Sequence, residues 1–133
     1  MRVGVVVSDR GDWTAEAIGS GLSRQGAKAE YLDFSELAAL VGPDLRFRGE
    51  GRDLLGLSAL IVRDLGRRGS ADVAFRFEAL SALEELGVRV VNPPSAIQRA
   101  ANKFATSVAL QRAGIPHPET LVTTSLSAAE EFV

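Results

Sequence analysis

Three polar side chains stand at the ends of short apolar runs, and their chemistry suits the binding of a charged ligand. Asp9, Arg63 and Asn92 each follow or close such a run. In an open parallel sheet, ligands bind beyond the carboxyl ends of the strands, near the point where the strand order reverses. If the runs are parallel strands, the three side chains come to the same edge of the sheet and are candidate binding residues.

Arg63 is the strongest of these candidates, because its planar guanidinium can bind a carboxylate or a phosphate through two parallel hydrogen bonds. The alternative for Arg63 is an ion pair with Asp64 or Asp9 that merely closes the edge of the sheet. Asn92 has the alternative role of capping the helix that follows it. Asp12 is expected to cap the first helix.

The remaining motifs predict neither a catalytic residue nor a metal site. Gly19-Ser-Gly21 lies inside a predicted helix and not in a strand-to-helix turn, so it is no phosphate-binding fingerprint. The chain has no cysteine, which excludes a thiolate nucleophile and a Cys-ligated metal. Its one histidine, His117, stands between two prolines in a predicted surface loop. A basic cluster on a predicted hairpin is expected to be solvated; its members are Arg46, Arg48 and Arg52.

Strand patterns alternate with helical patterns along most of the chain, which predicts an α/β domain with a doubly wound, mostly parallel sheet and helices on both faces. The predicted core strands cover 2–8, 27–34, 58–63 and 88–91. Helices are predicted over 13–25, 35–41 and 70–86, with a hairpin over 45–55. The first helix has its apolar face at Trp13, Ala17, Ile18 and Leu22. The third has its apolar face at Val73, Phe77, Leu80, Leu83 and Leu86.

The pattern changes after Asn92, which predicts one finished unit over 1–93 and the first elements of a following lobe over 94–133. The second part is predicted to contain helices over 95–101 and 103–113 and a strand over 120–124. A capping box at Ser127-Ala-Ala-Glu130 opens a last helix that runs to the end of the chain. A lone strand and so short a helix are marginal by themselves, so this part is expected to be incomplete.

The composition is that of a folded domain, with 133 residues of which 46% are hydrophobic and 24% are charged. The net charge of −2 does not indicate a nucleic-acid partner or an anionic membrane surface. The apolar start is interrupted by Asp9 and Arg10, which leaves it too short for a signal peptide or a membrane span. We therefore expect a cytoplasmic protein with no nucleic-acid or membrane partner.

The segment 88–122 resembles the entry to an ATP-grasp ligase. In that superfamily a strand ends near an Asn, an Asp-Lys pair starts a later helix, and Gly-(Ile/Leu)-Pro-x-Pro-x-Thr follows that helix. Here the strand ends at Asn92, the pair is Asn102-Lys103, and the last motif reads Gly114-Ile-Pro-His-Pro-Glu-Thr120. Four upstream stretches are similar to the RimK-type branch of ribosomal-protein glutamate ligases: Ser8-Asp-Arg10, Tyr31-Leu-Asp33, the hairpin turn at Arg48-Gly-Glu-Gly51, and Ile61-Val-Arg-Asp-Leu-Gly66.

The resemblance implies an ATP-dependent carboxylate–amine ligase of the α-L-glutamate type, which works through an acyl phosphate and forms ADP. It implies that Lys103 contacts ATP phosphates and that Arg63, Asn92 and Asp9 face the carboxylate or amine substrate. Glutamate and a protein or small-molecule acceptor are the implied partners, and a homo-oligomer is compatible with the family.

ATP and Mg²⁺ are implied for the full-length enzyme, and neither is expected to bind tightly to this chain. The Mg²⁺ ligands and the second lysine of the family come from lobes that follow this part. The chain is therefore expected to be the Rossmann-like pre-ATP-grasp part of such an enzyme, together with the first elements of the next lobe, and to be inactive by itself.

A stand-alone signalling or small-molecule-binding domain is the alternative. Its strongest version is a phospho-receiver, with Asp9 after the first strand, Asp64 after the third core strand and a single downstream lysine. A receiver requires paired acids after the first strand and a lysine directly after a late parallel strand. Lys103 instead begins a helix, so the ligase interpretation is favoured.

Overall fold

The computed structural model describes residues 1–66 and 70–132. The chain divides into two compact units, Met1–Pro94 and the part that starts at Ser95. The first unit contains a parallel sheet and an antiparallel sheet, and the second contains helices joined by irregular segments. No helix among the described residues is both long enough and apolar enough to cross a membrane.

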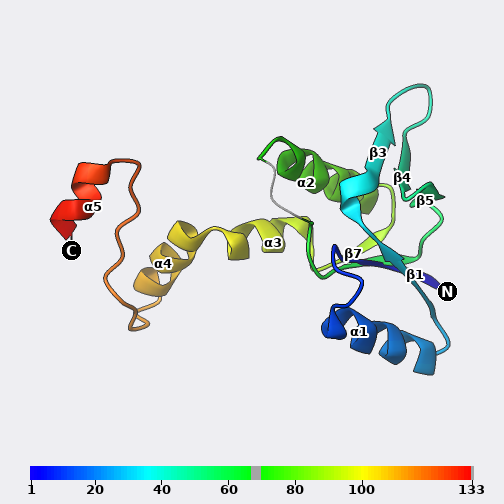
Figure 1. The fold of residues 1–133 in the computed structure, drawn as a ribbon, viewed down its shortest axis with the longest axis horizontal. Helices are drawn as coiled ribbons and strands as arrows, with labels where there is room; N and C mark the ends of the chain where they lie inside the picture. The colour runs from blue at the N-terminus through cyan, green and yellow to red at the C-terminus, as the bar shows by residue number, and fades with distance from the viewer. Residues whose placement is uncertain (67–69, 133) are drawn as a thin grey trace. The chain divides into compact units, whose positions relative to one another are not determined.

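The first unit is built around a parallel sheet of four strands in the order β2-β1-β6-β7. The helices α1 (Trp13–Arg24) and α2 (Ser70–Glu85) pack on opposite faces of this sheet (Figure 1). This arrangement confirms the predicted doubly wound α/β fold. The strands are β1 (Arg2–Val6), β2 (Lys28–Leu32), β6 (Ala59–Val62) and β7 (Arg89–Val91).

Two hydrophobic clusters lie on the two faces of the sheet. The smaller joins Val5 and Val7 to Ala15 of α1. The larger joins Val6 and Leu32 to α2 and to the segment between β2 and β6, and it includes Phe34, Phe47, Leu54, Leu60, Leu80 and Leu83. Alternate residues of β1 therefore serve different clusters, which explains why that strand reads as a continuous apolar run.

The segment over 35–41 was predicted as a helix, and this is wrong. Asp33 caps only a three-residue 3-10 turn, η1 (Phe34–Glu36), after which the chain becomes strand β3 (Leu37–Leu40). Strand β3 pairs antiparallel with β4 (Arg46–Gly49), which pairs with β5 (Arg52–Asp53) in the predicted hairpin. A short run of alanine and other apolar residues can form either a helix or a strand. Here it forms a strand, because β4 lies beside it and pairs with it.

The apolar face of α1 was predicted correctly at Ile18 and Leu22, which pack against the smaller cluster, and wrongly at Trp13 and Ala17. Asp12 starts the helix so that Ala15 and Gly19, one turn apart, face the sheet and are buried. Trp13 is 77% exposed, and Ala17 is exposed as well. In α2 the predicted face is correct at Leu80 and Leu83, whereas Leu86 lies beyond the end of the helix and is 50% exposed.

The second unit contains α3 (Pro94–Ala101) except for its first residue, α4 (Lys103–Arg112) and α5 (Leu126–Phe132). The strand predicted over 120–124 is wrong, because this segment is irregular and pairs with no strand in the described parts of the chain. The predicted capping box is also wrong. Helix α5 begins before Ser127, and the Ser125 hydroxyl accepts the backbone N–H of Ala128 at 3.3 Å. Val133, where the helix was predicted to end, lies outside the described residues.

Candidate functional site

The strand order of the parallel sheet reverses between β1 and β6, and this is the position where open α/β sheets bind ligands. The chain leaves β1 toward α1 and β2 on one side, and β6 continues toward α2 and β7 on the other side. The backbone N–H of Arg63 donates to the Val6 carbonyl at 3.0 Å, so the loops that follow β1 and β6 lie together. Asp9, Arg63 and Asp64 all belong to these two loops.

Asp64 fastens the two loops to each other. The backbone N–H of Ser8 lies 3.2 Å from each carboxylate oxygen of Asp64, and the N–H of Gly66 donates to Oδ1 at 2.7 Å. A carboxylate that accepts backbone N–H groups in this way is a structural element of the site. It is not a free phosphate acceptor, which argues against the receiver alternative.

Arg63 forms an ion pair, but its partner is neither of the two predicted. Its Nε lies 3.2 Å from Oδ2 of Asp12, so the alternative of a pair with Asp64 or Asp9 is wrong. The Arg63 side chain is 42% exposed, and its remaining guanidinium N–H groups can therefore reach a ligand. The geometry leaves Arg63 both anchored and accessible.

Asp12 combines this ion pair with the predicted helix cap. Its Oδ1 accepts the N–H groups of Thr14 at 2.8 Å and of Ala15 at 3.1 Å. These backbone donors, chiefly Ala15, hold the pKa of the Asp12 carboxyl below its usual value, and Arg63 lowers it further. Asp12 therefore stays charged at neutral pH and fixes the direction of the Arg63 side chain.

The other two predicted residues of this edge are less constrained. Asp9 is exposed, and its Oδ1 accepts the N–H of Gly11 at 2.8 Å, which closes a short turn in the loop. Asn92 is exposed and follows β7, one strand further along the sheet than Arg63. Within residues 1–66 and 70–132, its side chain makes no hydrogen bond to α3, so its alternative role as a cap is not supported.

Arg76 is a site-supporting residue that the sequence analysis missed. It lies in α2 and is only 5% exposed, and its guanidinium donates to the carbonyl of Leu65 in the loop after β6. A side chain on Gly66 would meet this guanidinium, since a Cβ there would lie 2.7 Å from Nη1. The available signal was an arginine beside the apolar face of a predicted helix, directly before Phe77.

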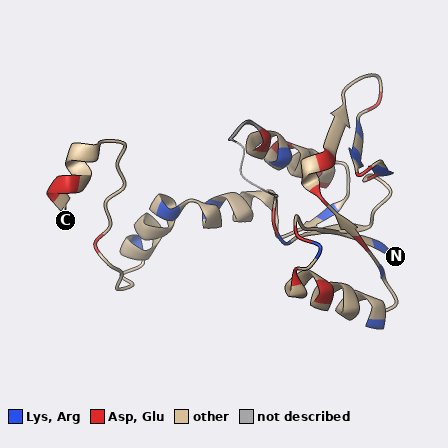
Figure 2. Cartoon of the chain, in the orientation of Figure 1, with Lys and Arg blue, Asp and Glu red and all other residues tan. Residues whose placement is uncertain are grey.

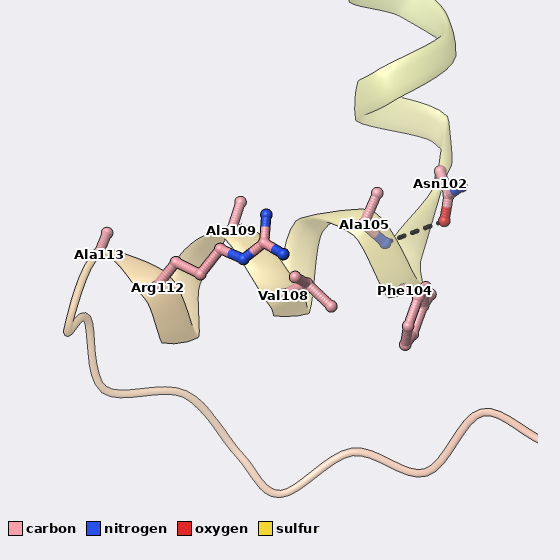
Figure 3. A pocket seen from close by; sticks show the side chains of 7 residues that line it. All are labelled: Asn102, Phe104, Ala105, Val108, Ala109, Arg112 and Ala113. Carbon is pink, nitrogen blue, oxygen red and sulfur yellow. Dashed lines mark hydrogen bonds between the residues drawn. The ribbon is translucent and has the colours of Figure 1, made fainter.

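Lys103 belongs to the second unit, where it is the first residue of α4 and is exposed. Asn102 caps this helix by accepting the Ala105 N–H at 3.0 Å, as Figure 3 shows. An exposed ammonium at a helix start suits contact with a phosphate group, because the backbone N–H groups there also favour an anion. The described residues contain no group of three metal-ligating side chains, so no Mg²⁺ site can be assigned to them.

Solved structures with a similar fold are ATP-grasp ligases. A RimK-domain ATP-grasp protein from Sphaerobacter thermophilus matches with a TM-score of 0.70 and 22% identity, over 99% of this chain and 44% of that one. The macrocyclase MdnC from Microcystis aeruginosa, solved with its precursor peptide MdnA, matches with a TM-score of 0.65 and 18% identity, over 99% of this chain and 49% of that one. No family model matches the chain.

The sequence comparison points to one group within this class. A tetrahydromethanopterin:alpha-L-glutamate ligase from Methanosarcina acetivorans is 39% identical over 133 residues, which cover 96% of this chain and 41% of that protein. The chain spans less than half the length of the curated relatives it matches. The predicted resemblance is confirmed: the chain is similar over nearly its whole length to part of an alpha-L-glutamate ligase, and it has the fold found in part of solved ATP-grasp ligases.

Proposed function

We propose that this chain is the substrate-facing N-terminal part of an ATP-dependent carboxylate–amine ligase that adds L-glutamate through an α-linkage. The proposal depends on one observation. Arg63 is held by Asp12 where the strand order reverses between β1 and β6, and its guanidinium is still exposed to a ligand. The similarity to alpha-L-glutamate ligases supports the choice of amino acid. The acceptor is a small molecule or a peptide, since the relatives with these folds include both kinds.

In this class of reaction, a carboxylate oxygen of the acceptor takes the γ-phosphoryl group of ATP and ADP is released. The amine of glutamate then attacks the carbonyl carbon of the acyl phosphate. The C–N bond forms as the C–O bond to phosphate breaks, and the nitrogen loses a proton. Both reactants bring carboxylates, so the protein must supply cations that bind and orient them.

Arg63 is suited to bind one of these carboxylates, and Asp12 positions its guanidinium. Asp9 and Asn92 lie in loops at the same edge of the sheet and are proposed to contact the remaining polar groups of the substrate. Lys103 is proposed to contact the phosphates of ATP when the chain is part of a longer enzyme. We expect neither ATP nor Mg²⁺ to bind tightly to these 133 residues by themselves.

A chimera tests the proposal. This chain replaces the matching part of the Methanosarcina acetivorans ligase, and formation of ADP is measured with ATP, Mg²⁺, glutamate and that enzyme's acceptor. We expect glutamate-dependent ADP release from the chimera and none from the 133-residue chain alone. Arg63→Gln in the chimera should lower kcat/KM for the acceptor or glutamate by about tenfold or more, because a charge-assisted hydrogen bond is lost.

Arg89→Gln is the matched control, because Arg89 is an exposed arginine at the start of β7, at the opposite end of its strand from the site. It should leave kcat/KM within about twofold of the unsubstituted chimera. Sustained ligation by the isolated chain would refute its assignment as an incomplete part. Equal effects of Arg63→Gln and Arg89→Gln in a folded, active chimera would refute the role of Arg63.

A further inference from the structure

A basic hollow lies along the edge strand β2, and Arg63 is not among the residues that line it. It measures about 490 Å³, within the range of about 300–1,000 Å³ that is typical of small-ligand pockets. Arg2 is the first residue of β1 and Lys28 is the first residue of β2. Figure 2 shows lysine and arginine in blue along the chain. Four of the residues that line the hollow are cations and one is a carboxylate: Arg2, Arg10, Lys28 and Arg52, with Glu30.

Three of these cations converge on the single carboxylate. Arg2 donates to Glu30 through Nε at 2.8 Å and through Nη2 at 3.0 Å, and Lys28 Nζ lies 3.9 Å from Oε1. Arg52 is close enough to help Arg2 and Lys28 hold the pKa of the Glu30 carboxyl below its usual value. Asp53 also lies close to Arg2, so Glu30 and Asp53 offset two of the three positive charges and the cluster keeps one positive charge in excess.

Two of the cations of the hollow, Arg2 and Arg52, are held in place before any ligand arrives. Arg2 is fixed by its two hydrogen bonds to Glu30, which is itself only 8% exposed. Arg52 Nη1 donates to the backbone carbonyl of Tyr31 at 3.2 Å, which leaves its other N–H groups available. Because two guanidinium groups are already ordered, binding an anion costs less side-chain entropy than at a set of free arginines.

Protection of an exposed strand edge does not account for this arrangement. One outward-pointing lysine is enough to discourage pairing of an edge strand with another chain. Here the cations come from β1, β2 and β5 and surround a common space, which protection of the edge does not require. Arg10 also lines the hollow, is paired with Glu50, and belongs to the same loop as Asp9 and Asp12.

We propose that this hollow is a second binding site, for a small multivalent oxyanion whose carboxylate or phosphate groups contact Lys28 and Arg52. Arg2 contributes to the positive potential while it remains paired with Glu30. The proposal goes beyond the ligase function and does not depend on Arg63, because the two sites share no residue.

Titration of the ¹⁵N-labelled chain, followed by amide chemical shifts at constant ionic strength, tests the proposal. Pyrophosphate and the tricarboxylate tricarballylate are the two probes, and chloride serves as the monovalent reference. We expect saturable shifts along β2 and at Arg52. The double variant Lys28→Gln/Arg52→Gln should weaken binding by about tenfold or more, and Arg89→Gln should change it by less than about twofold.

The probes also distinguish the two sources of the anion. Saturation by pyrophosphate alone supports a phosphate ligand, saturation by tricarballylate alone supports a carboxylate ligand, and saturation by both supports a general oxyanion site. Shifts that do not saturate, or that weaken equally in Arg89→Gln, would mean an adventitious ion only and would overturn the proposal. The amide spectrum of each variant verifies that it is folded.

Discussion

At the scale of single residues, the Arg63–Asp12 pair connects the start of α1 to the ligand-facing edge of the sheet. One carboxylate oxygen of Asp12 caps the helix and the other holds the guanidinium. A ligand that binds Arg63 therefore meets a side chain whose direction is set by the backbone of α1. This explains how a partly exposed arginine can offer a defined geometry without being buried.

The lowered pKa values of Glu30 and Asp12 predict how stability depends on pH. The pKa of the Glu30 carboxyl lies below its ordinary value of 4.5, because Arg2 donates hydrogen bonds to it. The pKa of the Asp12 carboxyl lies below its ordinary value of 3.8, because the N–H groups at the start of α1 donate to it. A carboxyl whose pKa is lowered by folding stabilises the folded protein at any pH above the pKa of the unfolded chain. That stabilisation is lost as the pH falls through the pKa of the folded protein. The free energy of unfolding should thus be nearly constant from pH 7 to about 5 and fall below about pH 4.

Glu30→Gln isolates one part of this effect. The variant should lose about 1 kcal/mol of unfolding free energy at pH 7, because Arg2 loses a charged partner. Its deficit relative to the unsubstituted chain should shrink as the pH falls, since the native carboxyl is then protonated. Urea denaturation at pH 7 and pH 3 measures both values. A deficit of the same size at both pH values would contradict the proposal that the deficit comes from the loss of the ion pair between Arg2 and Glu30.

At the scale of elements, the helices and strands that have a clear apolar periodicity and clear end signals could be predicted from the sequence. The four parallel strands and the helices α1, α2, α3 and α4 were all predicted, because each is either a β-branched run or an apolar repeat with clear end signals. The segments 35–41 and 120–124 failed because their state depends on a neighbouring strand, which is present for the first and absent from the described structure for the second.

Some features of the candidate site could be predicted from the sequence, and one could not. The loop positions of Asp9, Arg63 and Asn92 follow from the strand pattern, and the cap at Asp12 follows from its place before a helix. Which carboxylate pairs with Arg63 could not be read from the sequence. The pairing depends on where the start of α1 places Asp12 relative to the loop that follows β6.

Helix α2 offers a test of which apolar residues stabilise the fold. Leu83 has no exposed surface and lies in the larger cluster, whereas Leu86, also on the predicted apolar face, is 50% exposed. Leu83→Ala should lower the free energy of unfolding by about 2–5 kcal/mol. Leu86→Ala, the matched control, should change it by less than about 0.5 kcal/mol. Urea denaturation of both variants measures the difference, and equal effects would show that the helix packs differently.

At the scale of the whole molecule, burial is distributed unevenly between the two units. Both hydrophobic clusters lie within Met1–Pro94, whereas α4 and α5 have no buried residue. Large apolar side chains of the second unit are exposed, and they include Phe104 at 58% and Leu126 at 76%. Such an apolar surface is typical of a segment that packs against further protein, which agrees with relatives more than twice as long as the matched region.

This distribution predicts that residues 1–94 fold without the rest of the chain. A truncated protein ending at Pro94 retains both clusters and all strands of both sheets, so it should unfold cooperatively with a Tm within about 5 °C of that of the full chain. A peptide covering 95–133 should show no cooperative transition, because short helices without a core are marginal in water. Circular dichroism during heating measures both. Loss of cooperative unfolding in the 1–94 protein would mean that the second unit supplies stabilising contacts to the first, and the two units would then have to be regarded as one folding domain.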